Sequence, residues 1–178
     1  MVNDNLTLNF GGSVADLRLA ASKVTVPVLR KDFILDELQI VEARAAGAAA
    51  VLLIVRALAP GRLQSLLASS RAAGLDALVE VHTEAELTRA LEAGAEIVGV
   101  NSRDLDTFRI DVASAWKLLA TLSNEVVAVA ESGMHARGDV DQAAAAGADA
   151  VLIGTALSAA ADPAGLLREL AEVPRRGR

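Results

Sequence analysis

Gly47-Ala-Ala-Ala-Val-Leu-Leu-Ile54 is one copy of a pattern that decides the fold of this chain, and we call it the glycine–strand repeat. A helix rich in small residues ends at a glycine, two or three residues follow, and an apolar run then stops at a polar residue. The other copies are Gly74-Leu-Asp-Ala-Leu-Val-Glu80, Gly94-Ala-Glu-Ile-Val-Gly-Val-Asn101 and Gly147-Ala-Asp-Ala-Val-Leu-Ile-Gly154. Strands that are apolar throughout and polar only at their carboxyl ends are typical of a parallel sheet covered by helices, with functional residues on one rim.

Length and composition limit the possible classes of protein. The 178 residues favour one domain, which we expect over 1–172, followed by a basic, disordered tail over 173–178. A net charge of −6 and 2% aromatic residues argue against a nucleic-acid partner. Because the chain has no cysteine and only two histidines, His82 and His135, which do not form a helical metal-binding pair, we expect no metal site.

The hydrophobic content of 53% owes much to alanine, which indicates close helix packing rather than a membrane protein. No apolar run reaches the roughly 18 residues of a membrane-spanning helix. The first residues lack the basic start and long apolar stretch of a signal peptide. We therefore expect a cytoplasmic protein with no membrane contact.

Periodicity predicts short buried strands alternating with helices. The expected strands are 26–29, 51–55, 77–81, 97–100, 126–130 and 151–153. Asp36 and Asp162 are predicted helix N-caps, and Thr83 with Glu86 forms a predicted capping box. Strict alternation implies parallel strands. A doubly wound open sheet and a (β/α)8 barrel both fit; the even spacing favours a TIM-type barrel, here incomplete, with about six strands.

Charged residues at two strand ends are candidates for acid and base chemistry. Lys31 directly follows a predicted strand, where it is either a solvated turn residue or a proton donor at the barrel mouth. Neighbouring Arg30 would make its ammonium form less favourable. Glu80 lies inside an apolar run, so it is either a salt-bridge partner, with Lys31 or Arg103, or a general base.

Polar and glycine residues follow the later strands. Asn101 and Arg103 follow the strand 97–100, where they either form an ordinary turn or bind an anionic substrate. Ser132-Gly133 and Gly154-Thr155 follow the last two strands, which is the usual position of a phosphate site in barrels. The alternative is a pair of glycine turns without a ligand.

Several strings in this order resemble the indole-3-glycerol phosphate synthase family. The resemblance covers residues 6–172, and its most specific parts are Lys31-Asp-Phe-Ile34 and Asn101-Ser-Arg-Asp-Leu105. The other matching strings are Phe10-Gly-Gly-Ser13, Pro27-Val-Leu-Arg30, Val51-Leu-Leu-Ile-Val55, Leu78-Val-Glu-Val-His82, Ala130-Glu-Ser-Gly133 and Val151-Leu-Ile-Gly154.

The resemblance implies a carboxy-lyase of tryptophan biosynthesis that uses no cofactor or metal. Its phosphosugar substrate would be 1-(2-carboxyphenylamino)-1-deoxyribulose 5-phosphate, which closes to an indole with loss of carbon dioxide and water. Lys31 is similar to the general acid that protonates the ketose oxygen, Glu80 to the general base, and Asn101 to a polar partner of the carboxylate and substrate. The implied substrate-site residues are Phe33 and Leu52 as an apolar wall, Arg103, Ser132, and the phosphate cradle Gly133, Gly154 and Thr155.

The sequence departs from the family at its N-terminal side. It contains no Glu-x-Lys-x-x-Ser-Pro motif, which ends the first strand of family members, and it lacks their first two strand–helix units. Open strand edges favour pairing with another chain, so we expect a homo-oligomer or a complementing N-terminal fragment as partner. The alternatives to a synthase are a weak or inactive paralogue that binds a phosphorylated ligand, and another phosphosugar activity such as an isomerase, against which Lys31-Asp-Phe-Ile34 argues.

Overall fold

The computed structural model describes residues 12–105 and 107–175, and these form two compact units. The first comprises the described residues through Glu80 together with Arg89–Ala95, and the second comprises Val81–Thr88 and the described residues from Glu96 onward. Helix α5 (Glu84–Glu92) contributes residues to both. No helix among the described residues is long and apolar enough to cross a membrane.

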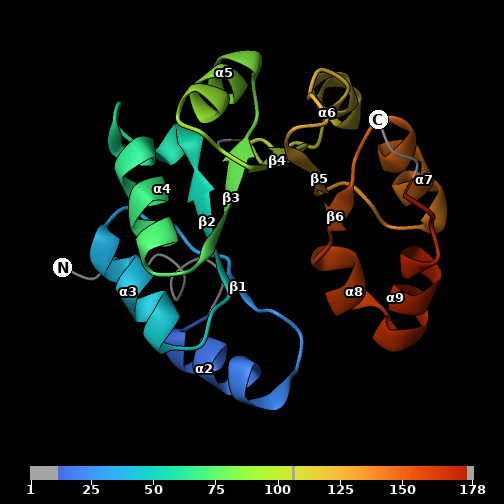
Figure 1. Ribbon diagram of the computed structural model, residues 1–178. Helices are drawn as coiled ribbons and strands as arrows, with labels where there is room; N and C mark the ends of the chain where they lie inside the picture. The colour runs from blue at the N-terminus through green and yellow to red at the C-terminus, as the bar shows by residue number, and fades with distance from the viewer. Residues whose placement is uncertain (1–11, 106, 176–178) are drawn as a thin grey trace. The chain divides into compact units, whose positions relative to one another are not determined.

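The first unit is a parallel ladder with helices packed on it (Figure 1). Strand β1 pairs with β2 and β2 pairs with β3, and α4 contacts both β2 and α3. Its elements are α2 (Val14–Lys23), β1 (Leu29–Arg30), α3 (Glu37–Ala45), β2 (Ala50–Ile54), the 3-10 turn η1 (Val55–Ala57), α4 (Arg62–Ala72) and β3 (Asp76–Val81).

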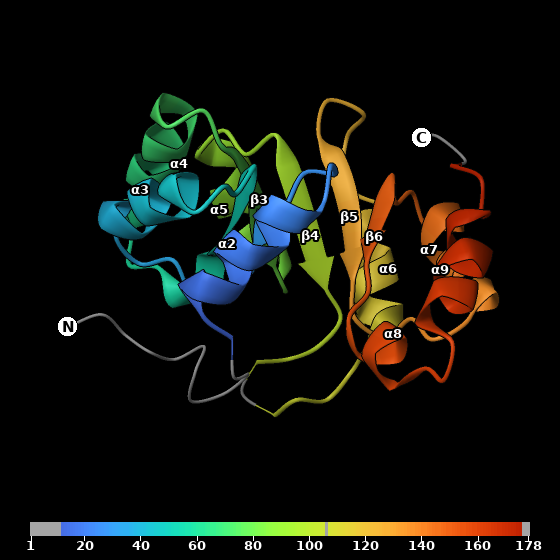
Figure 2. The same cartoon turned by 90° about the horizontal axis from the view of Figure 1, so that it is seen from below.

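The second unit repeats this arrangement (Figure 2). Strand β4 pairs with β5 and β5 with β6, all parallel; α6 packs on β4 and β5, and α7 contacts β6 and α9. Its elements are β4 (Ile97–Asn101), α6 (Val112–Leu119), β5 (Val127–Glu131), α7 (Arg137–Ala145), β6 (Ala150–Leu152), α8 (Thr155–Ala159) and α9 (Pro163–Ala171).

The glycine–strand repeat has the same backbone geometry in all four copies. Gly47, Gly74, Gly94 and Gly147 have φ values of 91°, 67°, 82° and 101°. In each copy the N–H after the glycine donates to a carbonyl five residues back; Ala48 N donates to Ala43 O at 3.0 Å. This is the Schellman ending of a helix, which requires the left-handed conformation that glycine adopts freely. The repeat is therefore a helix stop that leads directly into a strand.

The strand predictions are confirmed except at the first strand. Strands β2 to β6 lie within one residue of their predicted bounds, but β1 covers Leu29–Arg30 instead of 26–29. Pro27 has no N–H to donate, so the ladder begins only after it. Two helices were not predicted: α2, which Ser13 caps by accepting from Asp16 N, and the five-residue α8.

Helix starts follow the predicted capping residues. Asp36 caps α3 in a reciprocal capping box with Gln39, and Asp162 caps α9 with a proline in its first turn. Thr83 Oγ1 accepts from Glu86 N at 3.2 Å, but the Glu86 carboxylate accepts from His82 N, one residue before the predicted partner. These caps satisfy N–H groups that the helices leave without partners.

Helices α3 and α4 of the first unit are joined by a two-bond ion pair. The Arg62 guanidinium donates to both carboxylate oxygens of Glu37, at 2.8 and 2.9 Å. These bonds hold the pKa of Glu37 below its ordinary value and raise that of Arg62. Both side chains are on the surface, so the pair fixes the geometry of the two helices more than it stabilises the fold.

Arg175, the last described residue, forms an ion pair within the second unit. Arg175 Nη2 lies 2.7 Å from Asp149 Oδ1, and Asp149 Oδ2 accepts from Ala128 N at 2.9 Å. The last three residues of the tail predicted to be disordered lie outside the described residues. The single-domain boundary at 172 stays a prediction.

We predict that Gly47→Ala destabilises the protein more than Gly74→Ala. Both glycines have left-handed φ values, which cost alanine about 1–2 kcal/mol. A Cβ at Gly47 would also lie 2.9 Å from Ala21 Cβ, whereas a Cβ at Gly74 would have no neighbour within 4 Å. Urea unfolding of both variants measures the difference. Equal losses would contradict the packing of α2 against this turn.

Candidate functional site

The strands of the first unit place the predicted residues on one face. Ile54 is opposite Glu80 and Leu52 is opposite Leu78, so these side chains share a face of the sheet. Arg30 is opposite Val51, on the other face. Side chains alternate along a strand, so Lys31, the next residue, belongs with Leu52 and Glu80.

Lys31 and Glu80 form an ion pair in the first unit. Lys31 Nζ lies 3.7 Å from Glu80 Oε2, and the two side chains are 51% and 1% exposed. A fully buried carboxylate is costly without a compensating cation, so the pair explains how Glu80 is accommodated in an apolar strand. The predicted salt bridge to Lys31 is thus present, and it joins a proton donor to a proton acceptor.

Arg30 does not act on Lys31 as an uncompensated neighbouring charge. Its buried guanidinium lies 3.0 Å from Asp32 Oδ2 and 2.7 Å from Glu42 Oε2, on the helix side of β1. Two carboxylates therefore balance this cation. The expected effect of Arg30 on Lys31 stays a prediction.

The two residues predicted as an apolar wall differ in their surroundings. Phe33 is half-buried in the loop after β1, where its N–H donates to Asp32 Oδ1 at 2.7 Å and its carbonyl accepts from Gln39 Nε2 at 3.0 Å. Leu52 lies in the middle of β2 and is 1% exposed. Their roles toward a substrate stay predictions.

The second unit carries a polar pair at the ends of β4 and β5. Asn101 is opposite Glu131 in the ladder, and both are buried, Glu131 with 1% of its surface exposed. Ser102 donates to the Glu131 carbonyl from both its N–H, at 3.0 Å, and its hydroxyl, at 3.1 Å. Ser102 thus bonds the carboxyl ends of β4 and β5 to each other.

Glu131 received no role from the sequence, although the signal for it was the same as for Glu80. It ends the apolar run Val127-Ala-Val-Ala-Glu131, and in the structure it is as fully buried as Glu80. A carboxylate in such a place belongs among the functional candidates because solubility does not explain it.

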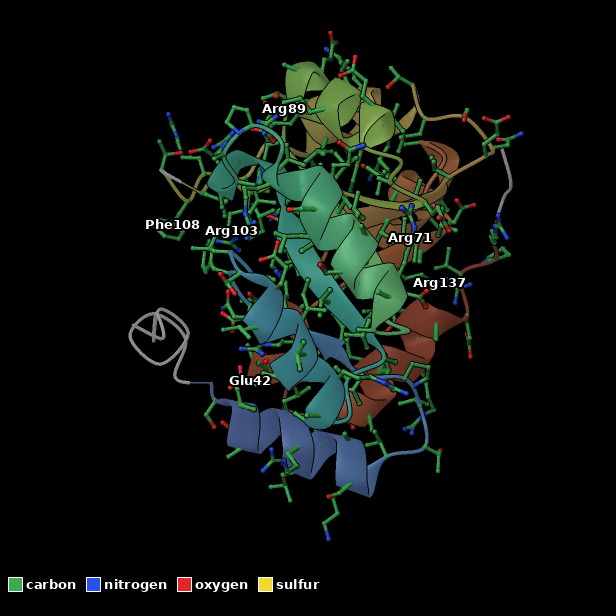
Figure 3. The ribbon with its side chains drawn as sticks, turned by 60° about the vertical axis from the view of Figure 1, so that its left-hand side comes forward. Glu42, Arg71, Arg89, Arg103, Phe108 and Arg137 are labelled. Carbon is green, nitrogen blue, oxygen red and sulfur yellow. The ribbon has the colours of Figure 1, made fainter. Side chains whose placement is uncertain are left out.

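Arg103 lies just after the end of β4 (Figure 3). Its N–H donates to Asn101 Oδ1 at 3.0 Å, and it forms an antiparallel bridge with Ile110. Asp111 caps α6, and hydrogen bonds from Ser114 hold the pKa of that carboxyl below its ordinary value. The Arg103 backbone is thus bonded to Asn101 and paired with Ile110.

Ser132 and Gly133 have an unusual backbone. Their φ values are 64° and 74°, so a serine occupies the left-handed region directly after β5. A non-glycine residue in this region carries strain, and such strain is concentrated at functional sites. Gly133 is packed so tightly that a Cβ would lie 2.6 Å from Val112 Cγ1 and 3.0 Å from Ser102 Oγ.

Gly154 and Thr155 follow β6 and are exposed. Gly154 is the N-cap residue of α8, which is only five residues long. A Cβ at Gly154 would meet nothing within 4 Å, so the backbone here is open to a ligand. A phosphate at this position stays a prediction.

Comparison with solved structures defines the class of fold. The chain is similar to 3-hexulose-6-phosphate synthase from Salmonella typhimurium, with a TM-score of 0.78 and 23% identity over 94% of this chain and 81% of that one. A mandelate oxidase variant matches with a TM-score of 0.67 and 24% identity over 89% of this chain and 60% of that one. At this identity the likeness concerns the fold alone, and it confirms the predicted (β/α)8-barrel class with six strands in the described residues.

Sequence comparison defines the family within that class. The family model described as indole-3-glycerol phosphate synthase matches residues 7–170, so the chain belongs to this family. Indole-3-glycerol phosphate synthase 2 of Streptomyces coelicolor is 52% identical over 161 residues, and the synthase of Opitutus terrae is 47% identical over 165 residues. Each alignment covers 90% of this chain but only 62% of the relative. The family predicted from the sequence is confirmed.

We predict that Gly133→Ala destabilises the protein by about 2 kcal/mol or more, because the left-handed backbone and the close contacts both oppose a Cβ. Gly154→Ala is the matched control, with open space and a negative φ, and we expect a change within about 0.5 kcal/mol. Thermal unfolding compares the two. A Gly133→Ala protein as stable as the control would show that the β5–α7 loop is not packed as described.

Proposed function

We propose that this chain carries the ring-closing chemistry of indole-3-glycerol phosphate synthase, within tryptophan biosynthesis. The observation that carries the proposal is the Lys31–Glu80 pair, 3.7 Å apart at the strand ends of the first unit. The substrate is 1-(2-carboxyphenylamino)-1-deoxyribulose 5-phosphate, which loses carbon dioxide and water. The relatives of about 50% identity that bear this name support the assignment.

Lys31 is the proposed general acid and Glu80 the proposed general base. An ammonium group has only protons to donate, and an ionised carboxylate only accepts them. Protonation of the ketose oxygen by Lys31 makes the ketose carbon more electrophilic toward the aromatic ring. The aromatic carbon that bears the carboxylate bonds to this ketose carbon as its oxygen becomes a hydroxyl, and loss of carbon dioxide restores the aromatic ring. The hydroxyl takes a second proton, from Lys31 reprotonated by solvent, and leaves as water, while Glu80 accepts the proton of the adjacent ring carbon as the double bond forms. The exposure of Lys31, 51% against 1% for Glu80, suits the residue that meets the substrate first.

The family resemblance assigns the proposed substrate contacts residue by residue. Asn101 supports the carboxylate and substrate, Arg103 and Ser132 bind the substrate's anionic and hydroxyl groups, and backbone N–H groups near Gly133, Gly154 and Thr155 hold the phosphate. The open space above Gly154 and the strained backbone at Ser132 support this assignment. Phe33 and Leu52 are the proposed apolar wall for the aromatic ring. Location in the cytoplasm is part of the same proposal.

We predict that Lys31→Ala and Glu80→Gln each reduce turnover by about 10²- to 10⁴-fold, the usual contribution of a positioned acid or base. The assay follows indole fluorescence from the carboxyphenylamino-deoxyribulose phosphate. Lys117→Ala and Glu92→Gln are matched controls, on α6 and α5, and we expect them to retain full activity. Variants of Lys31 and Glu80 with unaltered turnover would refute the assignment. No turnover in any protein, with retained binding of a phosphorylated ligand, would favour a non-catalytic family member.

A second proposal concerns the partner of this chain. Among the described residues, β1 pairs with β2 and β6 pairs with β5, each on one side. The chain also spans only 62% of the length of its relatives. An unpaired strand edge presents N–H and C=O groups that another strand can bond. We propose that a second copy, or a fragment carrying the remaining strands, covers these edges.

Light scattering after size-exclusion chromatography tests this second proposal. We expect the mass of a dimer or larger oligomer, compared with 18.4 kDa for one chain. If the chain alone is monomeric, co-expression with the N-terminal part of the Streptomyces coelicolor relative should yield a stable complex with increased turnover. A stable monomer that neither binds this fragment nor gains activity would exclude the proposed partner.

A further inference from the structure

We propose that Arg30 is a positioning residue that fixes the backbone of Lys31 and Phe33 by locking the β1–α3 loop onto α3. The proposal rests on the proposed function, in which Lys31 delivers the proton and Phe33 contacts the aromatic ring. Arg30 itself lies on the opposite face of the strand and touches neither group. It acts through the loop.

The side chains on either side of Lys31 are bonded to each other. Arg30 Nη2 and Nε lie 3.0 and 3.3 Å from the same Asp32 oxygen, Oδ2. Both side chains are nearly buried, 7% and 9% exposed. The hydrogen bonds between the Arg30 and Asp32 side chains span the backbone of Lys31. The backbone dihedral angles of Lys31 are restricted as a result. The other Asp32 oxygen accepts from Phe33 N at 2.7 Å, which extends the restraint by one residue.

The same guanidinium fastens this segment to helix α3. Arg30 Nη1 donates to Glu42 Oε2 at 2.7 Å and to the Gln39 carbonyl at 2.8 Å. Figure 3 labels Glu42 on α3, the helix that follows the loop. The cation thus bonds a strand-end loop and a helix at once, with two carboxylates and one carbonyl as acceptors.

Gln39 holds the far end of the loop. Its Nε2 donates to the Phe33 carbonyl at 3.0 Å, and its Oε1 accepts from Leu35 N at 2.8 Å and Asp36 N at 3.1 Å. Arg62 of α4 donates to the Leu35 carbonyl at 3.0 Å. The loop from Lys31 to Asp36 is therefore fixed at both ends without involving the Lys31 side chain.

A restraint on the Lys31 backbone matters for the position of its ammonium group. The side chain is half-exposed, and its contact with Glu80 is an ion pair of 3.7 Å rather than a short hydrogen bond. A long lysine side chain has high rotamer entropy, so the position of its Cα decides how often Nζ lies near Glu80. Arg30 fits this task because a planar guanidinium donates several hydrogen bonds in fixed directions, which a lysine cannot reproduce.

The test uses the small number of lysines. The chain has three, Lys23, Lys31 and Lys117, so reductive methylation with ¹³C-formaldehyde gives few NMR signals. The Lys31 signal is identified by its loss in Lys31→Arg, and Glu80→Gln gives its position without the ion pair. We expect Arg30→Met to move the Lys31 signal at least halfway toward the Glu80→Gln position. Arg71→Met, which removes an arginine that donates to Gly94 O at 2.6 Å in the same unit, should leave it unmoved.

Turnover adds a second readout. Misplacement of a catalytic group by about 1 Å costs up to roughly 10²-fold in rate. We therefore expect Arg30→Met to lower kcat and kcat/KM together by about tenfold or more, with little change in KM, because the interaction is lost in the transition state. If Arg30→Met does not fold, Arg30→Lys, which keeps the charge, is the test variant. We then expect a smaller shift of the Lys31 NMR signal in the same direction.

The outcomes separate the two proposals. An unmoved Lys31 signal in the folded Arg30 variant overturns the positioning role, whatever the activity. An equal shift in Arg71→Met also overturns it, because the effect would then be general destabilisation. If Arg30→Met shifts the Lys31 signal but the unsubstituted protein shows no synthase turnover, the proposed function is refuted and the positioning contact remains supported.

Discussion

A strand that is buried on both faces can carry a charged side chain only where it leaves the sheet, and this constraint organises the whole protein. In β2 and β3 every residue from the third onward is buried, and the one carboxylate among them, Glu80, lies next to the last residue. Strand β5 repeats this arrangement with Glu131 as its last residue. The glycine–strand repeat fixes the other end, since a left-handed glycine stops each preceding helix two or three residues before the strand begins. Chemistry is thereby confined to one end of each strand.

The two buried glutamates have different neighbours in the two units. In the first unit a half-exposed cation, Lys31, approaches Glu80 from the end of a neighbouring strand. In the second unit Glu131 is opposite an amide, Asn101, and its backbone carbonyl accepts twice from Ser102. An ammonium group can transfer a proton, whereas the neutral amide of Asn101 can only donate and accept hydrogen bonds. This difference supports our proposal that Lys31, rather than Asn101, transfers a proton.

The features that could be predicted from the sequence are those that depend on neighbouring residues. Strand bounds, the helix-stopping glycines and the caps at Asp36 and Asp162 follow from local patterns, and each was predicted. The pairing of Glu80 with Lys31 was one of two suggested partners, because a carboxylate in an apolar strand demands a cation. Pro27 delayed the first strand through its missing N–H, a local effect that the apolar run concealed.

The remainder depends on contacts that no short pattern encodes. Two partners of Arg30, Glu42 and the Gln39 carbonyl, come from a helix that begins seven residues later, so these contacts depend on how α3 lies on β1. Ser132 has a left-handed backbone, and the adjacent Gly133 lies close to Ser102 and Val112, which come from a different loop and helix. Helix α8 is too short to produce a periodic signal. These are tertiary effects, and they concern how precisely the site residues are held rather than which residues they are.

Charge balance around β1 explains why two cations can be adjacent in this sequence. Arg30 and Lys31 point to opposite faces of the strand, so their charged groups lie on different sides of the backbone. Asp32 and Glu42 accept from the first, while Glu80 pairs with the second. A cation at position 30 that lacked these carboxylates would be buried without compensation and would oppose the ammonium of Lys31. The aspartate of the Lys-Asp-Phe-Ile string therefore has a physical task of its own: it neutralises the arginine that holds the lysine in place.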